Sequence, residues 1–217
     1  MKPLTWKRAI SIRSFTIKLI TGLALLAVLF FIFPVFFEHI QQRQGIVLND
    51  FVLSNIPAIN VSVPLFICIW LPGLLIAYRA LKSPAIFINF LWSFLFLSAF
   101  RITTISVTAL NPPKNLVILA DPILSKFYGN NFITKDLFFS GHTATIFLMY
   151  LCLQKATDRI FALIAALLIG AFVLIQHVHY TIDVVFAIPF AYLACYLGLK
   201  VAGVDKSNRL NDDNAVH

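Results

Sequence analysis

Six apolar stretches, each near the length that crosses a bilayer as a helix, constrain this 217-residue chain more than any other feature. Hydrophobic residues make up 60% of the sequence and charged residues only 12%. Because a lipid interior offers no water to exposed backbone groups, such stretches must form helices that pack together. The sequence therefore predicts an all-α fold, a polytopic six-span transmembrane helical bundle, with spans at about Phe15–Phe37, Ala58–Tyr78, Pro84–Val107, Phe138–Gln154, Arg159–Gln176 and Tyr180–Lys200.

The residues between these stretches are too few to form a separate soluble domain. We expect one integral membrane domain over residues 1–217, with a catalytic core at about 84–200. Residues 1–14 would form a basic amino terminus and residues 201–217 a polar tail. The three cysteines fall within expected spans, and their spacing fits neither a metal site nor a disulfide framework.

The net charge of +8 would suit a nucleic-acid partner, but the positions of the basic residues argue against one. Twelve of the 17 Lys and Arg residues lie on the side of the two termini, four lie on the other side, and Arg101 falls within the third span. The positive-inside rule then places both termini in the cytoplasm. The basic amino terminus should attract anionic lipid headgroups rather than nucleic acid.

The unusual polar residues converge at one depth. With both termini inside, the third and fifth spans end, and the fourth and sixth begin, at the non-cytoplasmic face. The residues at these ends include Arg101, Ser140 to Thr143, His177, and His179 to Asp183. Ionisable groups in or beside apolar spans are costly and usually functional, so this convergence predicts an active site that faces the non-cytoplasmic side. The longest connection, about 108–137, lies on the same side, and a loop of this length is often a lid or binding element.

The spacing of His179 and Asp183 is i to i+4, which on a helix puts the two side chains on one face. The carboxylate can hold one imidazole nitrogen and leave the other free as a nucleophile or base. His142, preceded by Ser140 and Gly141, would supply a proton donor beside backbone amides that can cradle an anion. The alternative is that these polar residues only lock helices together.

Three other residues carry open alternatives. Arg101 either clamps phosphate oxygens with its guanidinium or extends to the headgroup layer. Asp136 either belongs to the site or caps the fourth helix, which it shortly precedes. His177 lies two residues from His179, so a supporting or interfacial role fits it better than a catalytic one.

Three sequence blocks match a known family. They are the run from Arg101 to Pro112, the block Asp136-Leu-Phe-Phe-Ser-Gly-His-Thr143, and the block His177-Val-His-Tyr-Thr-Ile-Asp183. In these blocks the chain resembles the sphingomyelin synthase-like branch of the type 2 phosphatidic acid phosphatase superfamily, over roughly residues 84–200. Thr134 and Lys135 stand where that branch has Cys and Gly, and Val173 stands where the wider superfamily has an arginine.

The resemblance implies phosphoryl transfer through a phosphohistidine-type intermediate, with His179 as nucleophile, Asp183 as its orienting carboxylate and His142 as acid and base. Phosphate binding would rest on Arg101, Ser140, Gly141 and Lys135, with Asp136, His177 and Thr143 in support. No metal and no cofactor is expected.

The donor would be a membrane glycerophospholipid carrying a phosphocholine- or phosphoethanolamine-like headgroup. The acceptor is open. A lipid alcohol such as ceramide or diacylglycerol would make the protein a transferase, and water would make it a lipid phosphate or diphosphate phosphatase. The non-enzyme alternative is a bundle that binds or transports lipid headgroups. The sequence does not give the oligomeric state or the host membrane.

Overall fold

The computed structural model of the chain describes residues 4–119 and 133–203. Within these residues the regular structure is helical, and one isolated β-bridge joins Ile46 and Leu110. The helices are α1 (Trp6–Ser11), α2 (Arg13–Gln42), α3 (Phe51–Ser54), α4 (Ser62–Lys82), α5 (Pro84–Val107), α7 (Gly141–Cys152), α8 (Ala156–Ile175) and α9 (Thr181–Ala202).

In the described part of the chain, five helices are long and apolar enough to cross a membrane: α2, α4, α5, α8 and α9. The predicted all-α membrane bundle is therefore confirmed. The fourth expected span, Phe138–Gln154, contains only the 12-residue α7, which at about 1.5 Å per residue is shorter than a hydrocarbon core of roughly 30 Å. It is shorter than expected because the chain at Phe138 bonds to α9 and the helix starts only after Ser140. The six expected spans thus correspond to five full-length helices and one short one.

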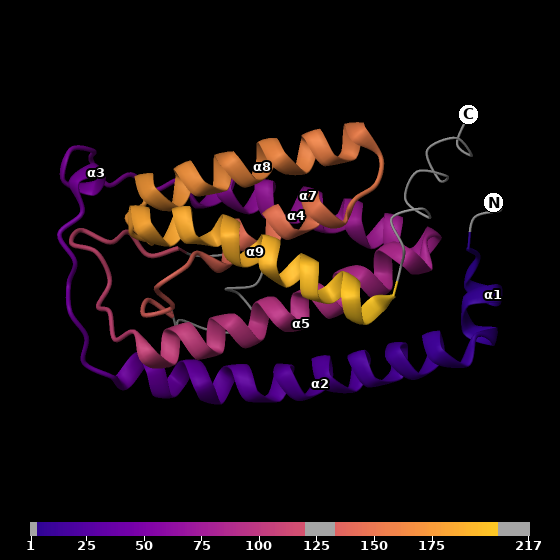
Figure 1. Ribbon diagram of the computed structural model, residues 1–217. Coiled ribbons are helices and arrows are strands. Elements are labelled where there is room, and N and C mark those ends of the chain that lie inside the picture. Colours follow the sequence, from indigo (N-terminus) through magenta and orange to yellow (C-terminus); the bar gives the residue numbers. More distant parts are fainter. Residues whose placement is uncertain (1–3, 120–132, 204–217) are drawn as a thin grey trace.

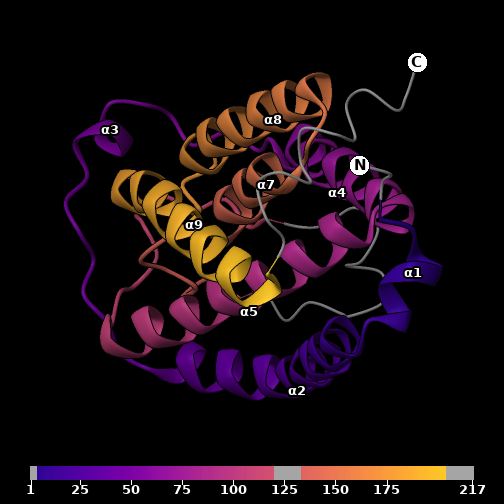
Figure 2. The same cartoon turned by 45° about the vertical axis from the view of Figure 1, so that its right-hand side comes forward.

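The bundle is built around α5 and α9, which lie side by side (Figure 1). The helices α4, α7 and α8 cover one side of this pair, and α2 runs along the other side of α5, as Figure 2 also shows. The main apolar core lies among α4, α5, α7, α8 and α9, and a smaller one joins α1 and α2 to α5. The helix α9 packs closely on α5 at Gly198, where an added Cβ would overlap Ser93.

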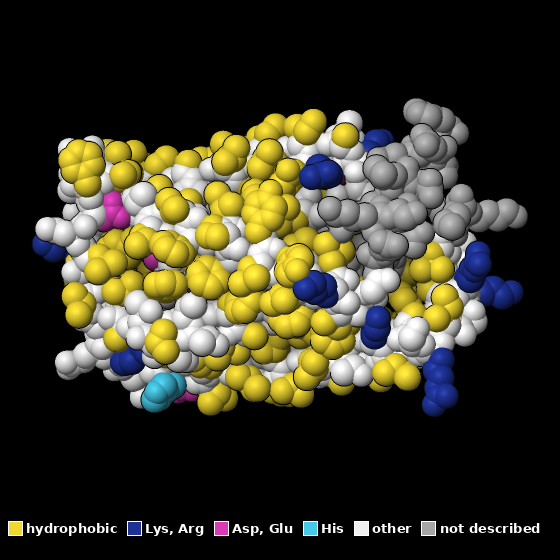
Figure 3. All heavy atoms as spheres, in the orientation of Figure 1, with side chains coloured by type: hydrophobic (Ala, Val, Ile, Leu, Met, Phe, Trp, Pro, Cys, Tyr) yellow, Lys and Arg dark blue, Asp and Glu magenta, His cyan; other side chains and the backbone are white. Residues whose placement is uncertain are grey.

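The surface is that of a membrane protein. Figure 3 shows hydrophobic side chains spread over the middle of the molecule, with more of the Lys and Arg side chains toward the end that carries α1. The helix α2 is the most peripheral span, and only Phe15, Gly22 and Ile40 of its 30 residues are buried. An apolar helix that leaves so much of its surface exposed is suited to contact with lipid.

The helix ends fall into two groups. The start of α2 meets the end of α9, where Lys18 Nζ donates to the carbonyl of Ala202 at 3.3 Å. At the opposite end of the bundle, α5 and α8 finish and α7 and α9 begin (Figure 1). The alternation of the spans therefore gathers the predicted site residues at one end, away from α1.

Candidate active site

The start of α9 holds His179 and Asp183 in direct contact. His179 Nδ1 lies 3.1 Å from Asp183 Oδ2, and both side chains are buried, at 3% and 0% exposure. The expected hydrogen bond is present, but the expected shared helix face is not, because α9 begins only at Thr181. His179 stands in the turn before the helix, and Asp183, in the first helical turn, reaches back to it.

Asp183 accepts three hydrogen bonds. Besides the His179 ring, the backbone N–H of Tyr180 donates to Oδ2 at 3.0 Å and that of Phe138 donates to Oδ1 at 3.2 Å. A carboxylate only accepts hydrogen bonds, and each of these three partners is a nitrogen that can donate. With Asp183 ionised, the bond requires the proton of His179 on Nδ1, so Nε2 carries the free lone pair.

The start of α7 brings the second histidine. Ser140 is the N-cap of α7. The Ser140 Oγ accepts from the backbone N–H of Thr143 at 3.4 Å and from the Thr143 hydroxyl at 3.1 Å. The interpretation of Asp136 as this cap is therefore wrong. The backbone N–H of Ser140 donates to the carbonyl of Asp183 at 2.9 Å, which fixes α7 directly against the first turn of α9.

His142 and His179 face each other across this junction. Their ring centroids are 6.4 Å apart and the ring planes meet at 65°. A group that transfers a proton or attacks an atom must approach within roughly 3 Å of it. Two imidazoles at this separation can therefore approach one phosphoryl group from two sides.

Arg101, in the last two turns of α5, reaches the same junction. Its guanidinium forms an ion pair with Asp136 through Nη2 and Oδ2. It also lies so close to Gly141 that an added Cβ there would overlap it. The absence of a side chain at Gly141 thus leaves room for the Arg101 guanidinium beside the amino end of α7. The guanidinium and the backbone N–H groups of this helix end both favour a bound anion.

Several buried polar atoms at this junction have no hydrogen-bond partner among the described residues. They are Nε of Arg101, Oδ1 of Asp136 and Nδ1 of His142. Buried polar atoms normally have a partner. Here, two nitrogens and a carboxylate oxygen at one place can bind both the oxygens of a phosphate and a hydroxyl or ammonium group beside it.

Residues 135–199 match a family model described as PAP2 superfamily C-terminal. The matched segment runs from Lys135 almost to the end of α9 and so includes both histidines. The match supports the type 2 phosphatidic acid phosphatase superfamily and a membrane enzyme of the lipid phosphatase or phosphotransferase type. The sphingomyelin synthase-like branch stays a prediction. No curated protein and no solved structure matches the chain.

The first residue of the PAP2 segment, Lys135, points to different partners. Its ammonium donates to the carbonyl of Arg43, and its backbone N–H donates to Gln41 at 3.3 Å. These contacts fix the junction between α2 and the segment before α7. The phosphate-binding role predicted for Lys135 stays a prediction, and the structure gives it another task.

His177 is buried at 3% exposure and adopts a left-handed backbone conformation, with φ of 55°. Its Nδ1 donates to the carbonyl of Lys114 at 3.0 Å, and its Nε2 has no partner among the described residues. Next to it, Gln176 bonds to the backbone of Val117 and Ile118 and to Ser62. Gln176 and His177 thus connect the chain at 114–118, the start of the long connection after α5, to the turn that carries His179.

No group of three or more His, Cys, Asp and Glu residues in the described part of the chain could hold a metal ion.

The long connection between the third and fourth spans lies only partly within the structure, since residues 120–132 fall outside the described residues. The role of lid or binding element predicted for it stays a prediction.

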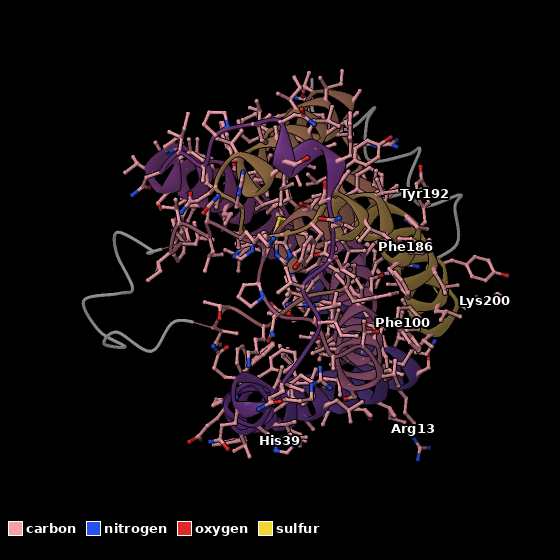
Figure 4. All side chains as sticks on the ribbon, turned by 90° about the vertical axis from the view of Figure 1, so that its left-hand side faces the viewer. Arg13, His39, Phe100, Phe186, Tyr192 and Lys200 are labelled. Atoms are coloured by element: carbon pink, nitrogen blue, oxygen red, sulfur yellow. The ribbon has the colours of Figure 1, made fainter. Side chains whose placement is uncertain are left out.

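Sequence reasoning missed Phe138. Its φ of 113° is rarely adopted by residues with a bulky side chain, and strain of this kind is often found at functional sites. This conformation turns its N–H toward Asp183, while its ring packs on Phe186 of α9 at 5.7 Å. Phe190 of α9 stacks on Phe139 at 4.7 Å and contacts Phe100 of α5 at 5.8 Å. Figure 4, which faces this end of the bundle, labels Phe100 and Phe186 on these neighbouring helices.

Sequence reasoning also missed two residues that hold the start of α9. Asp50 lies before the PAP2 segment, and Tyr180 lies within it. An Asn-Asp pair before an apolar run signals a helix cap at Asp50. No sequence signal pairs it with Thr181, whose backbone N–H donates to Asp50 at 2.6 Å.

Proposed function

We propose that the protein is a membrane lipid phosphotransferase that moves a phosphoryl headgroup from a glycerophospholipid to a lipid alcohol such as ceramide or diacylglycerol. The observation that carries the proposal is the pair of facing imidazoles, one of them oriented by a buried carboxylate. The PAP2 match supports the general reaction type. The resemblance of the three sequence blocks supports transfer to a lipid alcohol.

In the first half-reaction, Nε2 of His179 attacks phosphorus. A bond forms between this nitrogen and phosphorus as the bond from phosphorus to the lipid oxygen breaks. Asp183 stabilises the positive charge that develops on the His179 ring. His142 gives its proton to the departing oxygen, so the first product leaves as a neutral alcohol.

In the second half-reaction, the acceptor hydroxyl gives its proton to His142 as its oxygen bonds to phosphorus. The bond between phosphorus and His179 then breaks, and both histidines return to their starting states. In both steps the negative charge on the phosphoryl oxygens faces Arg101 and the amino end of α7. Fixed charges and dipoles of this kind contribute most when they are already in place before the reaction.

Water in place of the lipid alcohol would complete the same cycle as a hydrolysis. The assay that separates these outcomes uses purified protein and a phospholipid labelled in its headgroup, with and without ceramide or diacylglycerol. We expect labelled product lipid only when the acceptor alcohol is present. Release of a labelled water-soluble phosphate compound at the same rate with and without acceptor would make the protein a phosphatase. Saturable lipid binding without turnover would leave only a headgroup-binding bundle.

We further propose that both termini lie in the cytoplasm and that the site opens to the opposite side. Support comes from the twelve-to-four division of Lys and Arg and from the gathering of the site residues at the bundle end away from α1 (Figure 1). Reporter fusions at Lys2 and His217 test this orientation. Either terminus reporting from the far side of the membrane would overturn it.

A further inference from the structure

The segment from Gln41 to Asp50, here called the 41–50 segment, lies far before the PAP2 match in sequence. It includes the last two residues of α2 and the chain that follows. It contacts each of the three segments that bring side chains to the candidate site. These contacts are specific hydrogen bonds, so they can define relative positions rather than only fill space.

The first contact is with the end of α5, the helix of Arg101. The Arg43 guanidinium donates to the carbonyls of Ile105, Ser106 and Thr108 at 2.7–2.8 Å. The last carbonyls of a helix have no partner within it, so a cation placed there satisfies them and complements the helix dipole. The β-bridge of Ile46 then continues the contact into the residues after α5.

The second contact is with the segment that leads to Asp136 and α7. The Gln41 carboxamide oxygen accepts from the backbone N–H of Thr134 at 3.0 Å and of Lys135 at 3.3 Å. Its nitrogen donates to the Thr134 hydroxyl at 2.8 Å. One side chain therefore fixes the residues immediately before Asp136, the ion-pair partner of Arg101.

The third contact is with the start of α9. Asp50 Oδ2 accepts from the backbone N–H of Thr181 at 2.6 Å, and Oδ1 accepts from its hydroxyl at 2.9 Å. Two residues earlier, the backbone N–H of Leu48 donates to the Tyr180 hydroxyl at 3.1 Å, and that hydroxyl donates to the carbonyl of Asn111 at 2.9 Å. Tyr180 and Thr181 stand between His179 and Asp183, so these bonds act on the residues that join the pair.

A small apolar core supports these hydrogen bonds. It consists of Leu53, Leu110, Leu137 and Tyr180, with Leu48 and Leu174 packed against it. Tyr180 is only 1% exposed. Its four residues come from four segments: the chain after the 41–50 segment, the chain after α5, the chain before α7 and the start of α9. These four segments therefore pack together at one place.

We propose that the 41–50 segment sets the mutual positions of Arg101, Asp136 and the His179–Asp183 pair, and that Asp50 is the positioning residue for that pair. The kinetic part of this inference rests on the proposed function. Asp50 touches none of the groups that would contact substrate, and it acts through Thr181. A displacement of about 1 Å far from the chemistry can cost up to about 100-fold in rate, so loss of this contact has a measurable effect.

Asp50 also caps the short helix α3, where Oδ1 accepts from the backbone N–H of Val52 and Leu53. The two tasks can be separated. In Asp50→Asn, the remaining oxygen can keep the cap and the bond to the Thr181 hydroxyl, because Asn is as good an N-cap as Asp. The amide nitrogen replaces Oδ2 and cannot accept from the Thr181 backbone.

The experiment compares full-length wild type with Asp50→Asn, Thr181→Val and the double variant, in lipid nanodiscs. Thr181→Ser keeps the hydroxyl and is the conservative rescue. Ser83→Ala is the matched control, because Ser83 is the N-cap of α5 and lies at the end of the bundle away from the site. The readouts are kcat and KM for headgroup transfer, the thermal midpoint, and hydrogen exchange of the amides of residues 180–184.

We expect Asp50→Asn and Thr181→Val each to lower kcat by roughly tenfold with KM changed less than about twofold. The double variant should lose more than either single variant, because Asp50→Asn removes the bond from the Thr181 backbone N–H and Thr181→Val removes the bond from its hydroxyl. Exchange should increase at 180–184, Thr181→Ser should stay close to wild type, and Ser83→Ala should lower the thermal midpoint without lowering kcat.

Unchanged exchange at 180–184 would overturn the inference, whatever the activity. So would increased exchange with unchanged kcat, or an equal loss of kcat in Ser83→Ala at an equal loss of thermal stability. A wild type without turnover would instead defeat the proposed function. In that case the exchange data alone would decide whether Asp50 holds the start of α9.

Discussion

The two halves of the candidate site differ in how completely their polar atoms are bonded. On the α9 side, both oxygens of Asp183 accept hydrogen bonds, and one of them fixes the His179 ring. On the side of α5 and α7, Arg101, Asp136 and His142 each keep a buried atom without a partner among the described residues. One end of the bundle thus joins a pair whose hydrogen bonds are made to a cluster in which buried polar atoms lack partners among the described residues.

Under the proposed function, this difference separates the nucleophile, which is already oriented, from the side chains that would bind substrate. A buried polar atom without a hydrogen bond costs about 1–3 kcal/mol, and a bound group that supplies the missing bonds recovers that cost. The α9 side has little to gain from a ligand, whereas the cluster of Arg101, Asp136 and His142 has much to gain. We therefore expect changes on the α9 side to act on chemistry and changes on the other side to act also on binding and on the leaving group.

The largest effects should come from the α9 side. His179→Ala should abolish turnover, because no nucleophile remains. Asp183→Asn should leave the chain folded but lower kcat by about 10⁴-fold, the size of effect seen where a carboxylate orients a catalytic histidine. Steady-state turnover and the thermal midpoint, measured together, check both variants. Turnover above one-tenth of wild type in either variant would show that the α9 side does not supply the nucleophile.

On the other side, His142→Ala should lower turnover of a natural phospholipid by about 10²–10⁴-fold, the usual contribution of a general acid or base. The loss should be much smaller for the first half-reaction of an ester with a good leaving group, such as a nitrophenol, because that product leaves without a proton. Burst kinetics with the two substrates test this. An equal loss with both would show that His142 does not act as the acid.

Arg101→Lys should lower kcat/KM by about 10²–10³-fold, because an ammonium cannot reproduce the planar fork of a guanidinium. Gly141→Ala should have an effect in the same direction, since its methyl group would displace the Arg101 side chain. Titration of the variants with the phospholipid should show weaker binding as well as slower turnover. A change in kcat alone would assign Arg101 to the chemistry rather than to the phosphate surface.

The smallest effect concerns pH and Asp50. Burial raises the pKa of its carboxyl, but hydrogen bonds from Thr181, Leu53 and Val52 outweigh burial and hold that pKa below its ordinary 3.8. A lowered folded-state pKa contributes stability that is present above the unfolded pKa and lost as the pH falls through the folded one. The difference in thermal midpoint between wild type and Asp50→Asn should therefore be constant above about pH 5 and shrink below pH 3.8. A difference that does not change with pH would mean that these bonds do not depend on the charge.

Much of the fold was predictable because membrane spans depend on local sequence. The third span was predicted from its apolar run at the bounds that α5 has. The helix begins there because Ser83 caps it and Pro84 occupies its first turn. The length of α7 was not predictable, since it depends on the unusual backbone of Phe138 and its bond to Asp183, 45 residues away.

In the candidate site, too, some features depend on local sequence and others on contacts between distant residues. The spacing of His179 and Asp183 and the alternation of the spans were enough to bring the histidines, Asp183 and Arg101 to one end of the bundle. The geometry within that end was not predictable. The left-handed conformation of His177 ends α8 and puts His179 before α9, and the pairing of Arg101 with Asp136 joins residues 35 apart in sequence. Such contacts depend on the packed bundle rather than on any local pattern.

In the proposed mechanism, His179 carries the phosphoryl group and His142 transfers the proton. The most direct measurement is rapid quenching into alkaline denaturant, which preserves phosphohistidine, after mixing the protein with an ester that carries a labelled phosphoryl headgroup and a good leaving group. Wild type and His142→Ala should both trap label on His179, and His142→Ala should hold it longer because its second half-reaction lacks a base. His179→Ala should trap none. Label trapped by His179→Ala but not by His142→Ala would overturn this assignment, because the two histidines would then have exchanged roles.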